Sequence, residues 1–249
     1  TYGDEVSTSL DFDEISAGVL PVPVLTDYGA ETVSRTGYEE RDLMNYEAES
    51  LKSDFSLHFK PSANDFAIIL NSKIGRGNTI YQGANRYAIQ DFFMQQHKLE
   101  IKNDNFFARI YTTAEKSGNS YDTRFTGINI NRAWKGDTQW FRDYAGGFIG
   151  NLAGQGIFGT PTEAQIDAAH LAARGAADTG RLIPGTAAFD ETLERVTADG
   201  NVATGSKFND NSKLYHADAN YNLGHLIDFA EIQVGGSWRQ YSLNSGRTI

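Results

Sequence analysis

Hydrophobic and polar residues alternate along several segments of the chain. In the first of them the apolar residues Phe55, Leu57 and Phe59 are separated by single polar residues. A period of two is typical of strands that turn one face toward an apolar environment. The segments form three pairs, 55–59 with 66–70, 98–102 with 106–113, and 214–221 with 229–241. The pattern predicts about six antiparallel strands.

The connections between these segments fall into two classes. Tight turns rich in Asn, Asp, Gly and Pro are predicted at 61–65, 103–105 and 224–228, whereas 75–93 and 115–212 are long polar segments. Short turns on one side and long loops on the other are typical of a transmembrane β-barrel. The predicted fold class is therefore all-β, an antiparallel transmembrane barrel with a long, partly helical extracellular loop.

Aromatic residues gather where the predicted strands meet their turns. In a barrel such rings lie at the level of the lipid headgroups as a girdle. Aromatic residues also favour strands in general, so a soluble β-sandwich stays open as an alternative. The residues concerned are Phe59, Phe66, Phe106, Phe107, Tyr221 and Phe229.

The long segment 115–212 carries helical patterns. Trp140, Tyr144 and Phe148 recur at i, i+4 and i+8, and 163–177 is rich in Ala. The run 124–130 also alternates and is open to interpretation as a strand. The turns at 103–105 and 224–228 should lie on the same membrane face, so an even number of strands must separate them. The segments 106–113 and 214–222 already supply two strands. We therefore interpret 115–212 as one helical excursion.

These patterns divide the chain into four parts. Residues 1–50 are expected to be a loop region that leads into the barrel, 51–114 and 213–249 to be barrel strands, and 115–212 to be the extracellular loop. We expect the chain to be a fragment that continues beyond its last strand. No segment approaches the roughly 18–20 continuous apolar residues of a spanning helix.

Composition narrows the class of function. The net charge of −10 argues against nucleic acid as a partner, and the absence of Cys excludes disulfides and Cys-ligated zinc. The five His residues show no metal-binding spacing. Gly75 and Gly77 begin a dinucleotide-binding pattern, but Ile80 replaces its third glycine. We therefore expect no catalytic residue, no metal, no cofactor and no enzymatic activity.

Several stretches resemble one family of outer-membrane proteins. The runs 99–113, 118–125 and 131–135, together with 85–87 and 235–245, resemble barrels of TonB-dependent receptors of Gram-negative bacteria. The resemblance covers most of the chain, from about residue 24 onward, and is strongest to the Bacteroidota type that carries a carboxypeptidase-like regulatory domain.

The resemblance implies a barrel of about 22 strands filled by an N-terminal plug. It implies import of a bulky nutrient (an oligosaccharide, a peptide or a metal chelate) across the outer membrane, with work supplied by TonB through a segment not in this chain. The sequence departs from the family pattern because it contains no plug and only about six strands. Transported solute, TonB and a surface lipoprotein or other outer-membrane subunits are the implied partners.

Seven residues are candidates for ligand contact. Arg109 and Tyr111 should face the barrel interior if Ala108 and Ile110 face lipid, because strand residues alternate. Sets of aromatic and Arg residues suit sugars and anionic chelates, although an inward Arg also pairs with wall carboxylates and loop aromatics also pack on one another. The candidates in the long polar segments are Tyr81, Arg86, Tyr87, Trp140 and Tyr144.

Three functions remain open from the sequence. The first is nutrient transport through a TonB-dependent receptor. The second keeps the barrel but makes it a structural or docking subunit of an outer-membrane assembly. The third is a secreted carbohydrate-binding β-sandwich. The sandwich predicts a stable soluble domain, and both barrel interpretations predict dependence on detergent.

Overall fold

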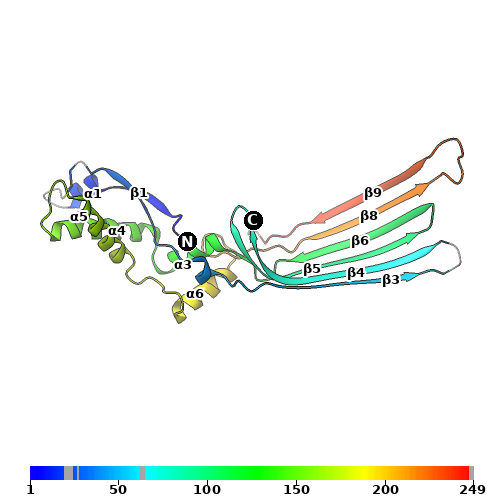
Figure 1. The fold of residues 1–249 in the computed structure, drawn as a ribbon, viewed down its shortest axis with the longest axis horizontal. Helices are drawn as coiled ribbons and strands as arrows, with labels where there is room; N and C mark the ends of the chain where they lie inside the picture. The colour runs from blue at the N-terminus through cyan, green and yellow to red at the C-terminus, as the bar shows by residue number, and fades with distance from the viewer. Residues whose placement is uncertain (20–24, 27, 62–64, 247–249) are drawn as a thin grey trace. The chain divides into compact units, whose positions relative to one another are not determined.

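The fold was obtained as a computed structural model that describes residues 1–19, 25–26, 28–61 and 65–246. Its contacts divide the chain into two compact units (Figure 1). The helical unit contains Thr1–Asn45 and Asp122–Ser206, and the sheet unit contains Tyr46–Tyr121 and Lys207–Ile249. Strands make up 39% of the structure and helices 29%, so the large antiparallel sheet is confirmed and the all-β class was too narrow.

The sheet unit is one antiparallel sheet in which the strand order is β3-β4-β5-β6-β8-β9, with the short β7 beside β5. Neighbours in this order are also neighbours along the chain, apart from the helical segment that separates β6 from β8. The three predicted strand pairs are therefore confirmed. The strands are β3 (Glu49–Phe59), β4 (Ala67–Gln82), β5 (Arg86–Lys102), β6 (Phe106–Lys116), β7 (Tyr121–Asp122), β8 (Lys213–Asn222) and β9 (Gln233–Ser242).

The predicted turn at 103–105 joins β5 to β6. The Asn103 carboxamide oxygen accepts hydrogen bonds from the backbone N–H groups of Asn105 and Phe106, both at 2.9 Å. An Asn side chain that bonds its own following backbone is a common way to stabilise a turn. The predicted turn at 224–228 lies in the connection from β8 to β9, and residues 62–64 of the predicted turn at 61–65 lie outside the described residues.

The prediction of a long polar loop over 75–93 was wrong. β4 and β5 continue through it and pair as far as Gln82 and Arg86 before a turn at 83–85. Polar residues occur on both faces of this extension, so the period-two signal disappears although the strands continue. The register shifts after Gly77, where a Cβ atom would lie 2.2 Å from the Glu49 carbonyl oxygen, so the site requires glycine.

The helical unit combines helices with a small two-stranded sheet of β1 and β2. The helices predicted within 115–212 are confirmed. The unit comprises β1 (Ser7–Asp11), α1 (Phe12–Val19), β2 (Ala30–Ser34), α2 (Glu40–Leu43), α3 (Thr123–Trp134), α4 (Asp137–Gly154), α5 (Glu163–Ala177) and α6 (Ala187–Ala198).

Helix α3 settles the two interpretations of the run 124–130 in favour of a helix. The Asp122 carboxylate accepts hydrogen bonds from the N–H groups of Arg124 at 2.8 Å and Phe125 at 3.1 Å. An Asp at this position satisfies N–H groups that have no partner inside the helix. The cap therefore starts a helix where the alternation of apolar residues also allowed a strand.

The core of the helical unit forms where α4 crosses α5. Trp140, Tyr144 and Phe148, the three residues predicted at helical spacing, are buried on one face of α4. Ala169, Ala173 and Ala177 of α5 are 0% exposed, and a Cβ atom at Gly147 would lie 3.0 Å from the Ala173 Cα atom. Small residues on both helices thus allow the close approach. No helix among the described residues is long and apolar enough to cross a membrane.

The expectation of a loop over residues 1–50 was wrong for about half of that range. β1, α1, β2 and α2 lie within the first 45 residues, and β3 begins at Glu49. Phe12 of α1 is 0% exposed, and its ring lies 4.3 Å from that of Phe148 in α4. α1, β1 and β2 contribute to the core around α4, whereas Leu43 of α2 packs in a second core cluster with Ile130 of α3. The sequence pattern of each element is too short to show a period.

Candidate functional site

The sheet unit places apolar and polar residues on opposite faces. Because neighbouring strands pair residue by residue, the register defines rows that cross the whole sheet on one face. We call the face that carries the apolar rows the apolar face. One row consists of Leu57, Leu70, Leu99, Ile110, Ala217 and Trp238, and the next of Phe59, Ile68, Ile101, Ala108, Ala219 and Gly236.

The described residues of the chain leave the apolar face exposed. Leu57 is 52% exposed, Ile110 57% and Trp238 56%, although they lie on different strands from one edge of the sheet to the other. Soluble monomers rarely expose a continuous apolar area of more than a few hundred Å². Burying apolar surface is favourable by roughly 25 cal/mol per Å², so a face of this kind requires an apolar environment.

An aromatic row borders this face at the edge where the tight turns lie. The ring centroids of Phe66 and Phe106 are 6.5 Å apart, and those of Phe106 and Tyr221 are also 6.5 Å apart. These three residues belong to the predicted girdle and are brought together. Phe107 lies on the opposite face, 5.1 Å from the Arg109 guanidinium, and Phe229 is 91% exposed in the connection between β8 and β9.

The opposite face carries a network of paired charges. Arg109 Nε donates to Asp218 Oδ1 at 2.7 Å, and His216 Nε2 lies 3.5 Å from the same oxygen. Arg239 Nε lies 3.3 Å from His216 Nδ1, and the Tyr111 ring stacks on that of His216 at 4.7 Å. Arg109 and Tyr111 therefore lie on the face opposite Ala108 and Ile110. Arg109 pairs with a carboxylate, as the alternative interpretation expected.

Tyr81, Arg86 and Tyr87 meet at the tip of the β4–β5 hairpin. The two tyrosine rings are 6.1 Å apart, and Tyr81 is 58% exposed. Arg86 Nη1 donates to the Gln82 carboxamide oxygen at 3.3 Å. The Phe208 ring lies 5.6 Å from that of Tyr87 and was missed from the sequence, because only the fold brings residue 208 to the hairpin.

Trp140 and Tyr144 lie in the core of the helical unit. Their rings stack at 5.3 Å, and they are 0% and 3% exposed. This burial favours the alternative in which these residues pack within the segment. The seven predicted binding residues thus occupy three separate places: the polar sheet face, the hairpin tip and the helical core.

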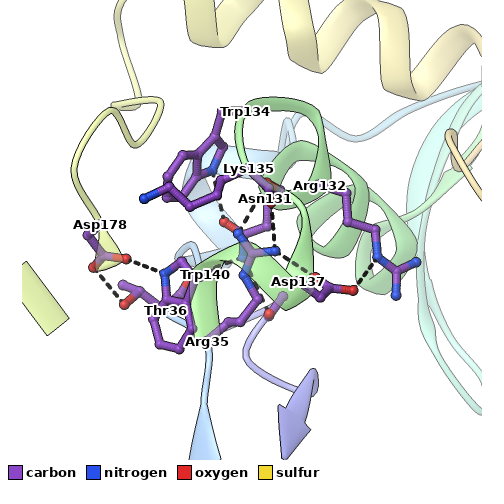
Figure 2. Close-up of polar contacts among 10 residues, drawn as sticks. Arg35, Thr36, Asn131, Arg132, Trp134, Lys135, Asp137, Trp140 and Asp178 are labelled. Carbon is purple, nitrogen blue, oxygen red and sulfur yellow. Dashed lines mark hydrogen bonds and ion pairs between the residues drawn. The ribbon is translucent and has the colours of Figure 1, made fainter. Parts of the chain in front are cut away.

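A buried cation at the centre of the helical unit was not predicted. Arg35, which follows β2, is 1% exposed and lies between the rings of Trp134 at 5.5 Å and Trp140 at 5.7 Å (Figure 2). Its Nη1 donates to Asp137 Oδ1 at 2.6 Å and to the Lys135 carbonyl oxygen at 2.9 Å. Burial lowers the pKa of Arg35, and the Asp137 carboxylate opposes that shift.

The contacts around Arg35 fasten distant segments together. Asp178, just after α5, accepts hydrogen bonds from Trp140 Nε1 at 2.9 Å and Thr36 Oγ1 at 2.7 Å (Figure 2). Arg132 of α3 also bonds Asp137, at 2.9 Å. Because these groups are paired with one another and Arg35 is shielded from solvent, we assign the cluster to the stability of the helical unit.

The part of the chain that the structure describes contains no cluster of side chains suited to bind a metal ion. No group of three or more His, Cys, Asp or Glu side chains lies close enough to hold a metal ion there. Comparisons with protein-family models, with curated proteins and with solved structures give no match. The functional argument therefore depends on the geometry of the two units.

Proposed function

We propose that the sheet unit is part of the wall of an outer-membrane β-barrel and that the chain belongs to a TonB-dependent receptor importing a bulky nutrient. The observation that carries the proposal is the uncovered apolar face on six adjacent strands, bordered by the aromatic row at the turn edge. Lipid on one side and water or a plug on the other would match the two faces of the sheet.

Strand length supports the membrane setting. A transmembrane strand needs about 9–11 residues when it is tilted by about 45°. β3 and β6 have 11 residues each, and β8 and β9 have 10 each. β4 has 16 residues and β5 has 17, so the hairpin that bears Tyr81 and Tyr87 would reach beyond the bilayer.

The edges of the sheet set a requirement for the proposal. Among the described residues β3 has only β4 as a neighbour and β9 has only β8. A backbone group without a partner costs several kcal/mol in hydrocarbon, so both edges need further strands in a membrane. The proposal therefore requires additional strands that close the barrel.

The polar face supports transport. In a barrel this face lines the lumen, where polar and charged residues meet a channel or a plug. The ion pair of Arg109 with Asp218 lies there, and so does that of Lys98 with Glu100 at 2.9 Å. A bulky polar solute needs a lumen of this kind, so the polar face fits transport, while a plug and a TonB-contacting segment would distinguish transport from docking.

The test starts with the native protein. Cell fractionation and electrophoresis with and without boiling should place it in the outer membrane as a heat-modifiable species larger than 27.4 kDa. Ile110→Arg should then lower the yield of assembled barrel, since Arg at the bilayer midplane costs about 2–4 kcal/mol. In water the same exposed substitution should change stability by no more than about 0.5 kcal/mol.

Ser237→Arg is the matched control, because Ser237 faces Asp218 on the polar face. Outer-membrane location, loss with Ile110→Arg and tolerance of Ser237→Arg would support the proposal. A soluble 27.4 kDa species that accepts both substitutions equally would overturn it.

A further inference from the structure

A cavity lies entirely within the helical unit. Its volume is about 470 Å³, within the usual range of about 300–1,000 Å³ for small-molecule sites. Residues of β2, α4 and α5 line it, and the ionisable ones beside Tyr144 are Glu31, His170 and Arg174. None of these three residues belongs to the sheet unit, and Arg174 also contacts Trp140 and Thr36 of the cluster around Arg35.

One wall of the cavity is an open strand edge. The Val6 carbonyl oxygen accepts a hydrogen bond from the N–H of Arg35, the residue after β2, at 3.0 Å. Backbone groups in an antiparallel pair alternate, so those of Val33 and Glu31 in β2 also point toward β1. The backbone groups of Thr32 and Ser34 consequently point the other way. The Ser34 carbonyl oxygen accepts from Arg174 Nη1 at 3.2 Å, which confirms that this edge faces α5.

Glu31 forms the negative end of the cavity, and its contacts connect it through His170 to the core. Glu31 Oε2 accepts a hydrogen bond from the Tyr28 hydroxyl at 2.7 Å and lies 3.1 Å from His170 Nε2. His170 Nδ1 lies 2.9 Å from the Tyr144 hydroxyl. Its ring packs 4.5 Å from that of Phe148, so the imidazole is fixed between the core and Glu31. The Glu31 side chain remains 46% exposed and accessible to a ligand.

The positive end is Arg174, one helical turn after His170. Its guanidinium lies 5.8 Å from the Trp140 ring and 5.5 Å from the Tyr144 ring, and Nη1 also donates to Thr36 Oγ1 at 3.0 Å. A guanidinium has five N–H donors, so these bonds leave further donors for a ligand. Two stacked rings hold the group in a fixed orientation.

The two charges lie at opposite ends of the open edge. Glu31 and Ser34 are three residues apart, which is about 10 Å along a strand. An extended tripeptide spans the same distance of about 10 Å. A peptide strand lying beside β2 would bond the backbone groups of Thr32 and the N–H of Ser34, as in strand addition to a sheet edge, while the Ser34 carbonyl oxygen keeps its bond from Arg174.

We propose that this cavity binds a short zwitterionic peptide, with its terminal amine at Glu31 and its terminal carboxylate at Arg174. The geometry selects this class because a sugar would use neither the separation of opposite charges nor the backbone groups of the strand edge. The proposal does not depend on the outer-membrane proposal, since every residue of the cavity lies in the helical unit.

The experiment is calorimetric titration of the full chain with trialanine, with N-acetyl-trialanine, with trialanine amide and with maltose. Trialanine should bind, and blocking either charged end should weaken binding about fivefold, as for partly exposed ion pairs. Glu31→Gln should abolish the effect of acetylation and leave the effect of amidation. Arg174→Gln should do the reverse, and Glu163→Gln, an exposed change at the start of α5, should alter neither.

Arg174 packs on two core rings, so circular dichroism must show that its variant is folded. If it is not, the four ligands on the natural chain and on Glu31→Gln decide the question. Equal binding of trialanine, N-acetyl-trialanine and trialanine amide, absence of trialanine binding, or tighter binding of maltose would each overturn the proposal.

Discussion

Replacement of Arg35 separates the contribution of its charge from that of its packing. Arg35→Met removes the guanidinium but keeps a long side chain between Trp134 and Trp140, whereas Arg35→Ala removes both. The difference in unfolding free energy between the two variants therefore measures what the side chain contributes by filling the space between the rings.

The partners that remain determine the magnitude for Met. Asp137 keeps its bond from Arg132 at 2.9 Å, and the Asn131 carbonyl oxygen keeps the Lys135 N–H at 3.2 Å. Arg35 also donates to the Lys135 carbonyl oxygen, and for this acceptor no second donor is described, so its loss costs about 1–3 kcal/mol. Arg35→Ala adds a cavity between two indole rings and should cost about 3–5 kcal/mol.

Urea unfolding of the full chain can resolve this difference. The chain has 3 Trp residues, so Trp238→Phe in the sheet unit leaves the fluorescence of Trp134 and Trp140 to report on the helical unit. With a slope of about 2 kcal/mol per M urea, the unfolding midpoint should fall by about 1 M for Met and about 2 M for Ala.

Equal midpoints for Met and Ala would refute the assignment of a packing role between the two rings. An unchanged midpoint for Ala would refute the structural role of Arg35 altogether. Circular dichroism of the Trp238→Phe parent checks that the reporter background keeps its fold.

Three further changes test other features. Gly77→Ala should disturb the pairing of β3 with β4, because its Cβ atom would lie 2.2 Å from the Glu49 carbonyl oxygen, and the hydrogen exchange of β3 should rise. Gly75→Ala is the control, because a Cβ atom there meets nothing within 4 Å and exchange should not rise. Asp122→Ala should cost about 1 kcal/mol through loss of the α3 cap, measured by thermal unfolding, and Asp122→Asn should cost less. The Lys135 ammonium lowers the pKa of Asp143, so this carboxylate stabilises the fold above about pH 4 and loses that effect as pH falls through its folded pKa. In unfolding measured against pH, Asp143→Asn should reduce the loss of stability at acid pH by about 0.5 kcal/mol.

Opposite outcomes would contradict each argument. Equal exchange in the two glycine variants would mean that the β3–β4 pairing tolerates a side chain at the bulge. An unchanged melting temperature for Asp122→Ala would remove the cap as the reason for the helix. Identical acid limbs for the natural chain and Asp143→Asn would show that Lys135 contributes no pH-dependent stability.

Alternation predicted the strands of the sheet unit because one face of each strand is apolar and stays so across the sheet. The same rule placed Arg109 and Tyr111 opposite Ala108 and Ile110, and the register confirms it. It failed over 75–93, where polar residues on both faces of β4 and β5 remove the period. Local sequence therefore predicts a strand only where its two faces differ.

The helical unit was predictable in its long helices but not in its first segment. The i, i+4 spacing of Trp140 and Tyr144 arises within one helix, so a local pattern contains it. Arg35 bonds to the Lys135 carbonyl and to Asp137, which are about a hundred positions away. The cavity proposed to bind a peptide likewise combines residues of β2 and α5 that are far apart in the sequence. No local pattern contains contacts of this kind.

The division of the helical unit into two chain segments has a kinetic consequence. Thr1–Asn45 leaves the ribosome or the export channel before Tyr46–Tyr121, and its partners in Asp122–Ser206 come only afterwards. At about 5–20 residues per second, synthesis of the intervening segment takes roughly 4–15 s. During this interval Phe12 and Arg35 have no core to enter, so the first segment needs a chaperone, or remains open to proteases, until α4 arrives.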